Sequence, residues 1–133
     1  MKKKWILILS IGALILLGAV LLLTHDFGAC PFADLKAEDL ASAQVQYYNW
    51  TKEVEDKEEL AALLREIRIY KEHRNWQNLS GMPTVVQLTY RDGHTATLRN
   101  LNTVFVIDEV GYKTQYRPAY ALSEYIYDLL DIG

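Results

Sequence analysis

The chain has 133 residues and one cysteine, and its 17 Asp and Glu residues outnumber its 14 Lys and Arg residues. This length provides one domain with a single core and not two. The acidic balance argues against a nucleic-acid-binding protein, because such proteins carry clustered positive charge. A single cysteine excludes an internal disulfide, so the core must hold without a covalent cross-link.

An apolar run begins close to the amino terminus. Residues 5–23 carry no charge and follow Lys2, Lys3 and Lys4. As a helix that rises about 1.5 Å per residue, this run reaches about 28 Å, close to the roughly 30 Å hydrocarbon core of a bilayer. The lysines on one flank predict a single-pass membrane anchor, with residues 1–4 in the cytoplasm and the carboxy-terminal part outside the cell.

Cys30 leaves two alternatives to an uncleaved anchor. It follows Gly28 and Ala29, which resemble the small residues before the lipidated cysteine of a bacterial lipoprotein. A cleaved secretory signal is the other alternative. Both fit less well than an anchor, because Phe27 stands where those signals have Leu or a small residue, and because polar residues separate the apolar run from the cysteine.

The sequence after the anchor divides into a short connection and one domain. Residues 24–39 mix Pro31 with small and charged residues, which suits a tether, and we expect the extracytoplasmic domain to span residues 40–133. From residue 31 onward the chain has 11 Lys and Arg residues against 16 Asp and Glu residues, a net charge of -5. Such a domain is a poor partner for nucleic acid or for anionic lipid.

Two amphipathic helices are predicted in the domain. Asp56 can cap the first, and Glu59 stands three residues later, as in a capping box. Pro118 suits the first turn of the second helix. Each helix has an apolar stripe with the spacing i, i+3, i+4 and i+7. The stripes are Leu60, Leu63, Leu64 and Ile67 in the first helix, and Leu122, Tyr125, Ile126 and Leu129 in the second.

About five antiparallel strands are predicted around these helices. Alternating or β-favouring residues indicate strands near residues 43–51, 68–74, 103–107 and 112–116, and a hairpin over residues 84–100. Two helices and such strands predict an α+β domain in two layers, with both helices on one face of the sheet.

The hairpin has a register that can be predicted. A two-residue turn would place polar side chains opposite Val86 and Leu88, so these apolar residues would have no apolar partners on the opposite strand. A three-residue loop, Arg91 to Gly93, with Gly93 in the left-handed bulge position avoids this. That loop aligns Val86, Leu88 and Tyr90 with Leu98, Ala96 and His94.

No catalytic, cofactor or metal motif stands out in the sequence. His25, His73 and His94 are widely separated, and none has a second ligand at the spacing of a zinc site. There is no glycine-rich phosphate loop, nucleophile elbow or pair of catalytic carboxylates. We therefore expect no enzymatic activity, no cofactor and no metal ion.

Aromatic residues are the main surplus, with nine Tyr and three Trp in the chain. Adjacent residues of a strand point to opposite faces, so Tyr47 and Tyr48 cannot both be buried under the helices. Exposed Tyr and Trp favour binding, although such rings can also fill the second face of a sheet. The residues expected to bind a partner are Tyr48, Trp50, Trp76, Tyr112 and Tyr116.

The order of these elements over residues 31–131 resembles small uncharacterised membrane-anchored exported domains of Gram-positive bacteria. The short pieces that carry the resemblance are Pro31-Phe32, Arg91-Asp92-Gly93 and Val110-Gly111-Tyr112. The resemblance implies an exported location and an α+β fold, and it implies no activity.

These features favour a membrane-tethered interaction or sensory domain without catalytic activity, which binds an envelope protein or peptide. The alternatives are an accessory, lipoprotein-like structural factor and a small envelope enzyme with an unrecognised site. A pocket with convergent polar groups would favour the enzyme, whereas an exposed aromatic patch would favour the interaction domain.

Overall fold

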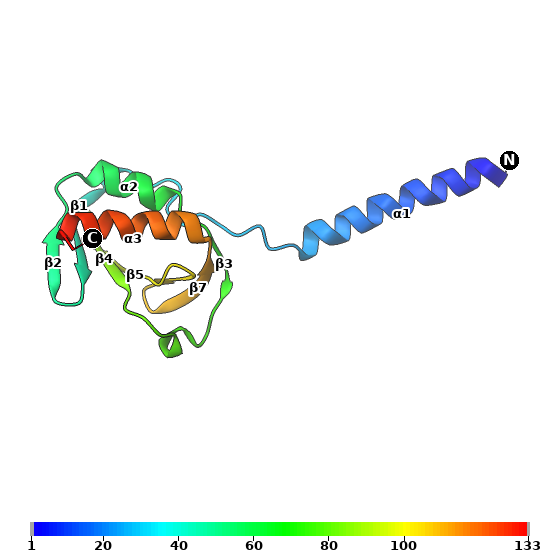
Figure 1. The fold of residues 1–133 in the computed structure, drawn as a ribbon. Coiled ribbons are helices and arrows are strands. Elements are labelled where there is room, and N and C mark those ends of the chain that lie inside the picture. Colours follow the sequence, from blue (N-terminus) through cyan, green and yellow to red (C-terminus); the bar gives the residue numbers. More distant parts are fainter. Residues whose placement is uncertain (1, 133) are drawn as a thin grey trace.

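The apolar amino-terminal run forms helix α1, Lys2–Thr24, in the computed structural model, which describes residues 2–132. Helix α1 extends away from the rest of the chain, and its large apolar side chains are exposed (Figure 1). The helix is long and apolar enough to span a membrane or to act as a signal sequence.

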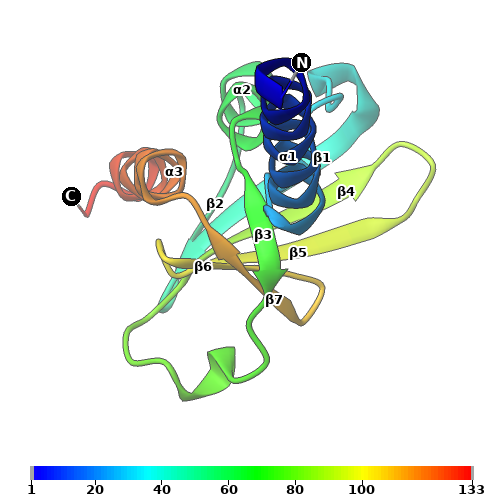
Figure 2. The same ribbon diagram turned by 90° about the vertical axis from the view of Figure 1, so that its right-hand side faces the viewer.

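The remaining elements form an α+β domain built on one antiparallel sheet, with strand order β2-β1-β4-β5-β6-β7-β3. Figure 2 shows that this sheet is strongly curved. The strands are β1 Leu40–Tyr47, β2 Trp50–Glu53, β3 Ile69–Glu72, β4 Thr84–Tyr90, β5 Thr95–Asn100, β6 Val104–Ile107 and β7 Val110–Thr114. The helices are α2 Lys57–Arg65 and α3 Tyr116–Leu130, with short 3-10 turns η1 Ala37–Asp39 and η2 Trp76–Asn78.

The sheet has seven strands, so the prediction of about five was too low. The stretch predicted as one strand over residues 43–51 is a hairpin in which β1 turns back into β2. The turn is made at Tyr48, whose φ of 53° is unusual for a residue other than glycine. Tyr47 pairs with Trp50 across it. Neither Gly nor Pro marks this turn, so the strongest local indications of a turn are missing here.

The predicted register of the β4–β5 hairpin is confirmed. Val86 pairs with Leu98, and Leu88 pairs with Ala96. The hairpin closes with a hydrogen bond of 2.9 Å from the backbone nitrogen of Tyr90 to the backbone oxygen of His94. Gly93 has a φ of 97° inside the three-residue loop, which is the left-handed conformation that the bulged turn requires.

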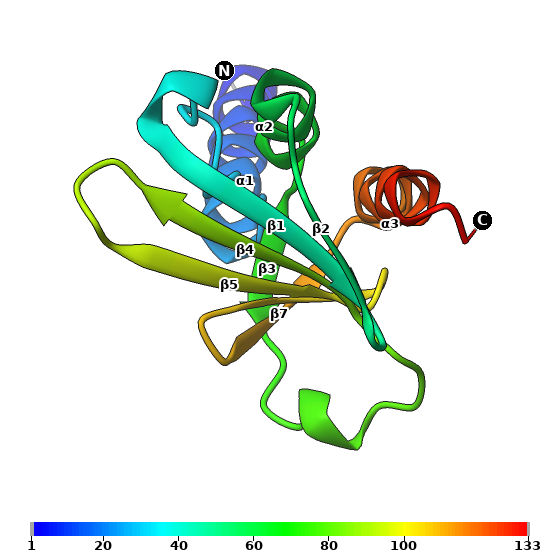
Figure 3. The same cartoon turned by 90° about the vertical axis from the view of Figure 1, so that its left-hand side faces the viewer.

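Helices α2 and α3 cover one face of the sheet, as predicted (Figures 1 and 3). Their apolar stripes form the core with the inward face of the strands. Asp56 caps α2, because its side chain accepts a hydrogen bond of 3.1 Å from the backbone nitrogen of Glu59. In the two stripes Leu60, Leu64, Ile67, Leu122 and Ile126 are fully buried, and Leu63, Tyr125 and Leu129 are partly buried.

A buried polar cluster fixes α3 to the sheet. The side chain of Asn100 on β5 donates hydrogen bonds of 2.6 Å to the backbone oxygen of Ala119 and 3.1 Å to the hydroxyl of Ser123, both on α3. The Ser123 hydroxyl donates in turn to the side-chain oxygen of Asn102 over 2.7 Å. These bonds give α3 one defined position, because sliding it would leave buried polar groups unpaired.

The segment between α1 and β1, predicted as a tether, is attached to the domain along much of its length. Phe32 and Leu35 are buried in the core. Ahead of them, Ala29 forms an antiparallel bridge with Ile69 of β3. The packing of the domain therefore includes residues that precede residue 40.

Candidate partner-binding surface

The five residues predicted to bind a partner lie in three places. Tyr48 lies in the β1–β2 turn and Trp50 follows it as the first residue of β2, and their side chains are 51% and 52% exposed. Their ring centroids are 6.3 Å apart and the rings meet edge to face. Among the five predicted residues, Tyr48 and Trp50 are the only two whose rings contact each other in the part of the chain that the structure describes.

Trp76 has a structural position at the other end of the sheet. Its ring covers Gly111 of β7 so closely that a Cβ atom there would lie 2.7 Å from the Trp76 Cδ1 atom. Its indole nitrogen donates a hydrogen bond of 3.2 Å to the backbone oxygen of Glu109. Tyr112 lies on the same strand and is partly buried. These contacts attach the long β3–β4 connection to the β6–β7 turn.

Tyr116 is the fifth predicted residue and lies on α3 rather than on the face opposite the helices. It is 53% exposed and stacks on Tyr120, one turn later, with ring centroids 5.5 Å apart and an angle of 14° between the ring planes. Sequence reasoning did not select Tyr120 as a binding residue, although its spacing of four from Tyr116 predicts the contact on a helix.

The same face of α3 continues toward its carboxy terminus. Tyr120 and Tyr127 line a hollow of about 410 Å³ together with Glu124 and Asp128. The spacing i, i+4, i+8 and i+11 from Tyr116 to Tyr127 places this row on one side of the helix. Tyr127 was also missed, and the signal that could have found it is this periodicity.

Tyr127 joins the helix row to the β1–β2 turn. Its ring lies 5.2 Å from that of Tyr47, and the ring of Tyr47 lies 4.7 Å from that of Tyr48, in both cases between centroids and edge to face. The result is a surface that we name the aromatic strip. Its members, in spatial order, are Tyr116, Tyr120, Tyr127, Tyr47, Tyr48 and Trp50.

The surroundings of Tyr120 and Tyr127 raise the pKa of both hydroxyls. A hydrogen bond to Glu124, followed by the charge of that carboxylate, raises the pKa of Tyr120. Burial raises the pKa of Tyr127, and its neighbour Tyr47 adds to the effect. Neutral phenol groups can donate or accept hydrogen bonds while their rings provide apolar contact area.

The described residues offer no built metal site, since none of their His, Cys, Asp and Glu side chains form a group of three that could hold an ion. In comparisons with known proteins, the chain matches no family model, no curated protein and no solved structure. No relative therefore assigns a role to the aromatic strip, and its function must be inferred from its own geometry and charge.

Proposed function

We propose that this chain is a membrane-tethered extracytoplasmic interaction or sensory domain that binds an envelope protein or peptide without catalysing a reaction. The observation that carries the proposal is the aromatic strip. It places four rings that are each at least 41% exposed, Tyr48, Trp50, Tyr116 and Tyr120, along a single continuous surface. Tyr and Trp dominate the energetics of protein interfaces because they give large contact area with few rotatable bonds.

The strip rests on a rigid support, which favours binding. Ring contacts join Tyr116 to Tyr120 and join Tyr127 through Tyr47 and Tyr48 to Trp50. The buried hydrogen bonds of Asn100 hold α3 against the sheet. A surface that is ordered before binding loses less conformational entropy when a partner docks.

The proposed location rests on α1 as an uncleaved anchor with its lysine-bearing end in the cytoplasm. Gly28 supports this over lipidation of Cys30. Its φ is +73°, and a Cβ atom there would lie 2.7 Å from the backbone oxygen of Ile69. A small residue is thus required at this position by packing in the folded domain, so no signal-peptide motif is needed to explain it.

The geometry also gives the strip a direction relative to α1. Helix α3 begins beside β3, since the backbone nitrogen of Gln115 donates to the backbone oxygen of Arg68 over 3.3 Å. The segment after α1 joins the same strand at Ile69. Helix α3 then runs away from this junction, and the β1–β2 hairpin lies at the end of the domain far from α1 (Figure 1). This hairpin carries Tyr48 and Trp50. This end would be accessible to a partner in the envelope.

The test is capture of a partner by the full chain after chemical cross-linking in its own membranes. Trp50→Ala and Tyr120→Ala should each weaken capture by about 2 kcal/mol, roughly thirtyfold, while the thermal transition of the domain stays in place. Val110→Ala is the matched control, because Val110 is a 37% exposed apolar side chain on β7, a strand that does not pair with β1 or β2. Capture by both strip variants at the wild-type level would refute the role of the strip.

A further inference from the structure

A groove between α2 and α3 lies next to the aromatic strip. It has a volume of about 540 Å³, and it shares Glu124 and Asp128 with the hollow of Tyr120 and Tyr127. Leu63 is one of its partly buried apolar members. The residues that line it are Glu59, Ala62 and Leu63 on α2, Glu66 at the carboxy-terminal cap of α2, and Ala121, Glu124, Tyr125 and Asp128 on α3.

The two helices contribute matching rows to this groove. On each helix the four lining residues have the spacing i, i+3, i+4 and i+7, which defines one face. Each row combines two carboxylates with two apolar or aromatic side chains. All four carboxylates, Glu59, Glu66, Glu124 and Asp128, are exposed, whereas the larger side chains Leu63 and Tyr125 are partly buried, so the groove combines apolar surface at its base with acidic side chains at the solvent. We refer to it as the acid-rimmed groove.

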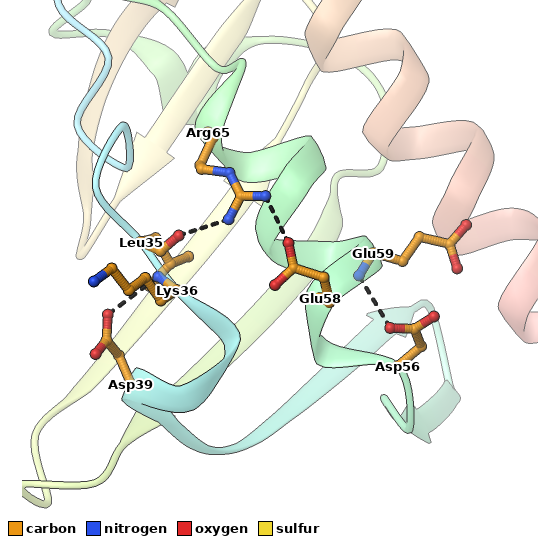
Figure 4. A network of polar contacts seen from close by, with 7 residues as sticks. All are labelled: Leu35, Lys36, Asp39, Asp56, Glu58, Glu59 and Arg65. Carbon is orange, nitrogen blue, oxygen red and sulfur yellow. Dashed lines mark hydrogen bonds and ion pairs between the residues drawn. The ribbon is translucent and has the colours of Figure 1, made fainter.

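The basic residues of α2 do not neutralise these carboxylates. The ammonium group of Lys57 lies 3.3 Å from the backbone oxygen of Leu40, on β1. The guanidinium group of Arg65 donates to the backbone oxygen of Leu35 over 2.8 Å and pairs with Glu58 over 2.7 Å. Figure 4 shows Arg65 and Glu58 on one side of α2, whereas Glu59 extends toward α3. No Lys or Arg is among the described residues that line the groove.

The basic residue of α3 stands at the end of the groove. Arg117 lies in the first turn, two turns before Glu124, and it is exposed. It forms no ion pair with the described residues. One cation beyond the end of the groove leaves the four carboxylates as its dominant charge.

The negative potential of the groove also acts on Tyr125. Burial, followed by the charges of Glu59 and Asp56, raises the pKa of the Tyr125 hydroxyl from 10.0 to about 12. The groove therefore presents its charge beside a partly desolvated interior, where electrostatic interactions are less screened than in water.

An anionic segment would be repelled by the four carboxylates, and a neutral apolar segment would desolvate them without compensation. Lys and Arg side chains satisfy both parts of the groove, because their aliphatic stems cover apolar surface while their charged ends reach the carboxylates. The rings of Tyr120 and Tyr127, beside Glu124 and Asp128, add a place for a cation over an aromatic face.

From this complementarity we infer that the acid-rimmed groove binds a basic amphipathic segment, bearing Lys or Arg, of the partner protein. A groove between two helices suits an amphipathic helix that presents apolar residues inward and basic residues to the edges. The inference rests on the proposed function, since it names the chemistry of the partner that the aromatic strip would engage.

The test uses the full chain in nanodiscs of zwitterionic phosphatidylcholine, with empty discs to measure binding to lipid. The probe is a fluorescent synthetic amphipathic peptide of about 14 residues, with Lys at its polar positions and Leu and Ala at its apolar positions. Two counterparts carry Gln or Glu at every Lys position. We expect fluorescence anisotropy to show that the Lys peptide binds at least about tenfold more tightly than the Gln peptide, with the Glu peptide weakest.

Two double variants separate the groove from the overall charge of the domain. Glu66→Gln with Glu124→Gln should weaken binding of the Lys peptide by about tenfold or more. Glu38→Gln with Glu72→Gln removes the same charge outside the groove and should keep affinity within about threefold of the wild type. Equal affinities for the two double variants, equal binding of all three peptides, or no binding of the Lys peptide would overturn the inference.

The outcomes also distinguish this inference from the proposed function. Loss of partner capture by Trp50→Ala, together with unchanged binding of the Lys peptide by the groove variant, would retain the interaction domain and reject the groove. Full capture by the strip variants, together with Lys-peptide binding that depends on Glu66 and Glu124, would reject the strip and retain the groove.

Discussion

The backbones of Ala29 and Ile69 pair through two hydrogen bonds, each 2.8 Å from the nitrogen of one residue to the oxygen of the other. Close by, the guanidinium group of Arg68 donates to the backbone oxygen of Phe27 over 2.8 Å. These bonds attach the chain to the edge strand β3 only a few residues after α1 ends at Thr24. A movement of the domain relative to α1 must therefore take place between Thr24 and Phe27 or break this attachment.

Gly28→Val is expected to break this attachment. The φ of Gly28 is +73°, and a Cβ atom would approach the Ile69 oxygen to 2.7 Å and the Tyr70 Cε1 atom to 2.9 Å. Strain of this kind costs on the order of 1–3 kcal/mol. Limited proteolysis of the full chain in detergent micelles should show faster cleavage after α1. Gly81→Val is the matched control, because its φ is also positive but no atom lies near its Cβ position. Equal cleavage of the two variants would contradict the role of Gly28.

Leu64→Ala should lower the free energy of unfolding by about 2–5 kcal/mol, because Leu64 is fully buried at the centre of the core. Thermal unfolding of the full chain, followed by circular dichroism in detergent micelles, measures this loss. Leu79→Ala makes the same chemical change at a 37% exposed position and should stay within about 0.5 kcal/mol of the wild type. Similar losses for both variants would mean that Leu64 does not form the core.

Periodicity predicted the elements whose structure is local. The helical stripes around Leu64 and Ile126 are buried, and the β4–β5 register follows the apolar pattern and the conformation of Gly93. The β1–β2 hairpin could not be predicted in this way, because its turn places Tyr48 in a left-handed conformation that this residue type rarely adopts. Contacts made elsewhere in the fold determine such a turn.

The candidate surface was predicted only in part, because it joins residues distant in sequence. Because adjacent residues of a strand point to opposite faces, Tyr48 was expected to be exposed, and Tyr116 was also among the residues expected to bind a partner. Both side chains are exposed. The contact between Tyr47 and Tyr127, which connects the two halves of the strip, depends on how α3 crosses the sheet. Helix packing on a sheet is a tertiary property that no spacing along one element encodes.

Asn100→Ala should destabilise the domain by about 1–3 kcal/mol, because it removes two buried hydrogen bonds to α3. Loss of these bonds also frees α3 to shift, so partner capture through the strip should weaken in the same variant. Asn78→Ala, at an exposed position in η2, is the control and should alter neither property. An unchanged thermal transition for Asn100→Ala would show that the buried cluster does not fix the helix.

Tyr125→Phe is expected to stabilise the protein. The Tyr125 hydroxyl is buried and has no hydrogen-bond partner among the described residues. A buried unsatisfied group costs about 1–3 kcal/mol, so its removal should raise the free energy of unfolding by about 1 kcal/mol at pH 8. Tyr116→Phe, which removes the hydroxyl of a 53% exposed ring, should stay within about 0.5 kcal/mol of the wild type.

The same substitution should change how stability depends on alkaline pH. Burial raises the pKa of Tyr125 from 10.0 to about 12 in the folded protein, so the unfolded chain loses this proton first as the pH rises. Below pH 10 both states keep the proton, and as the pH rises from 10 to about 12 the free energy of unfolding falls, because deprotonation favours the unfolded chain. Urea unfolding of the full chain in detergent micelles at pH 8 and pH 11 should show a smaller alkaline loss for Tyr125→Phe than for the wild type. Parallel losses in the two proteins would place the Tyr125 hydroxyl in water rather than between α2 and α3.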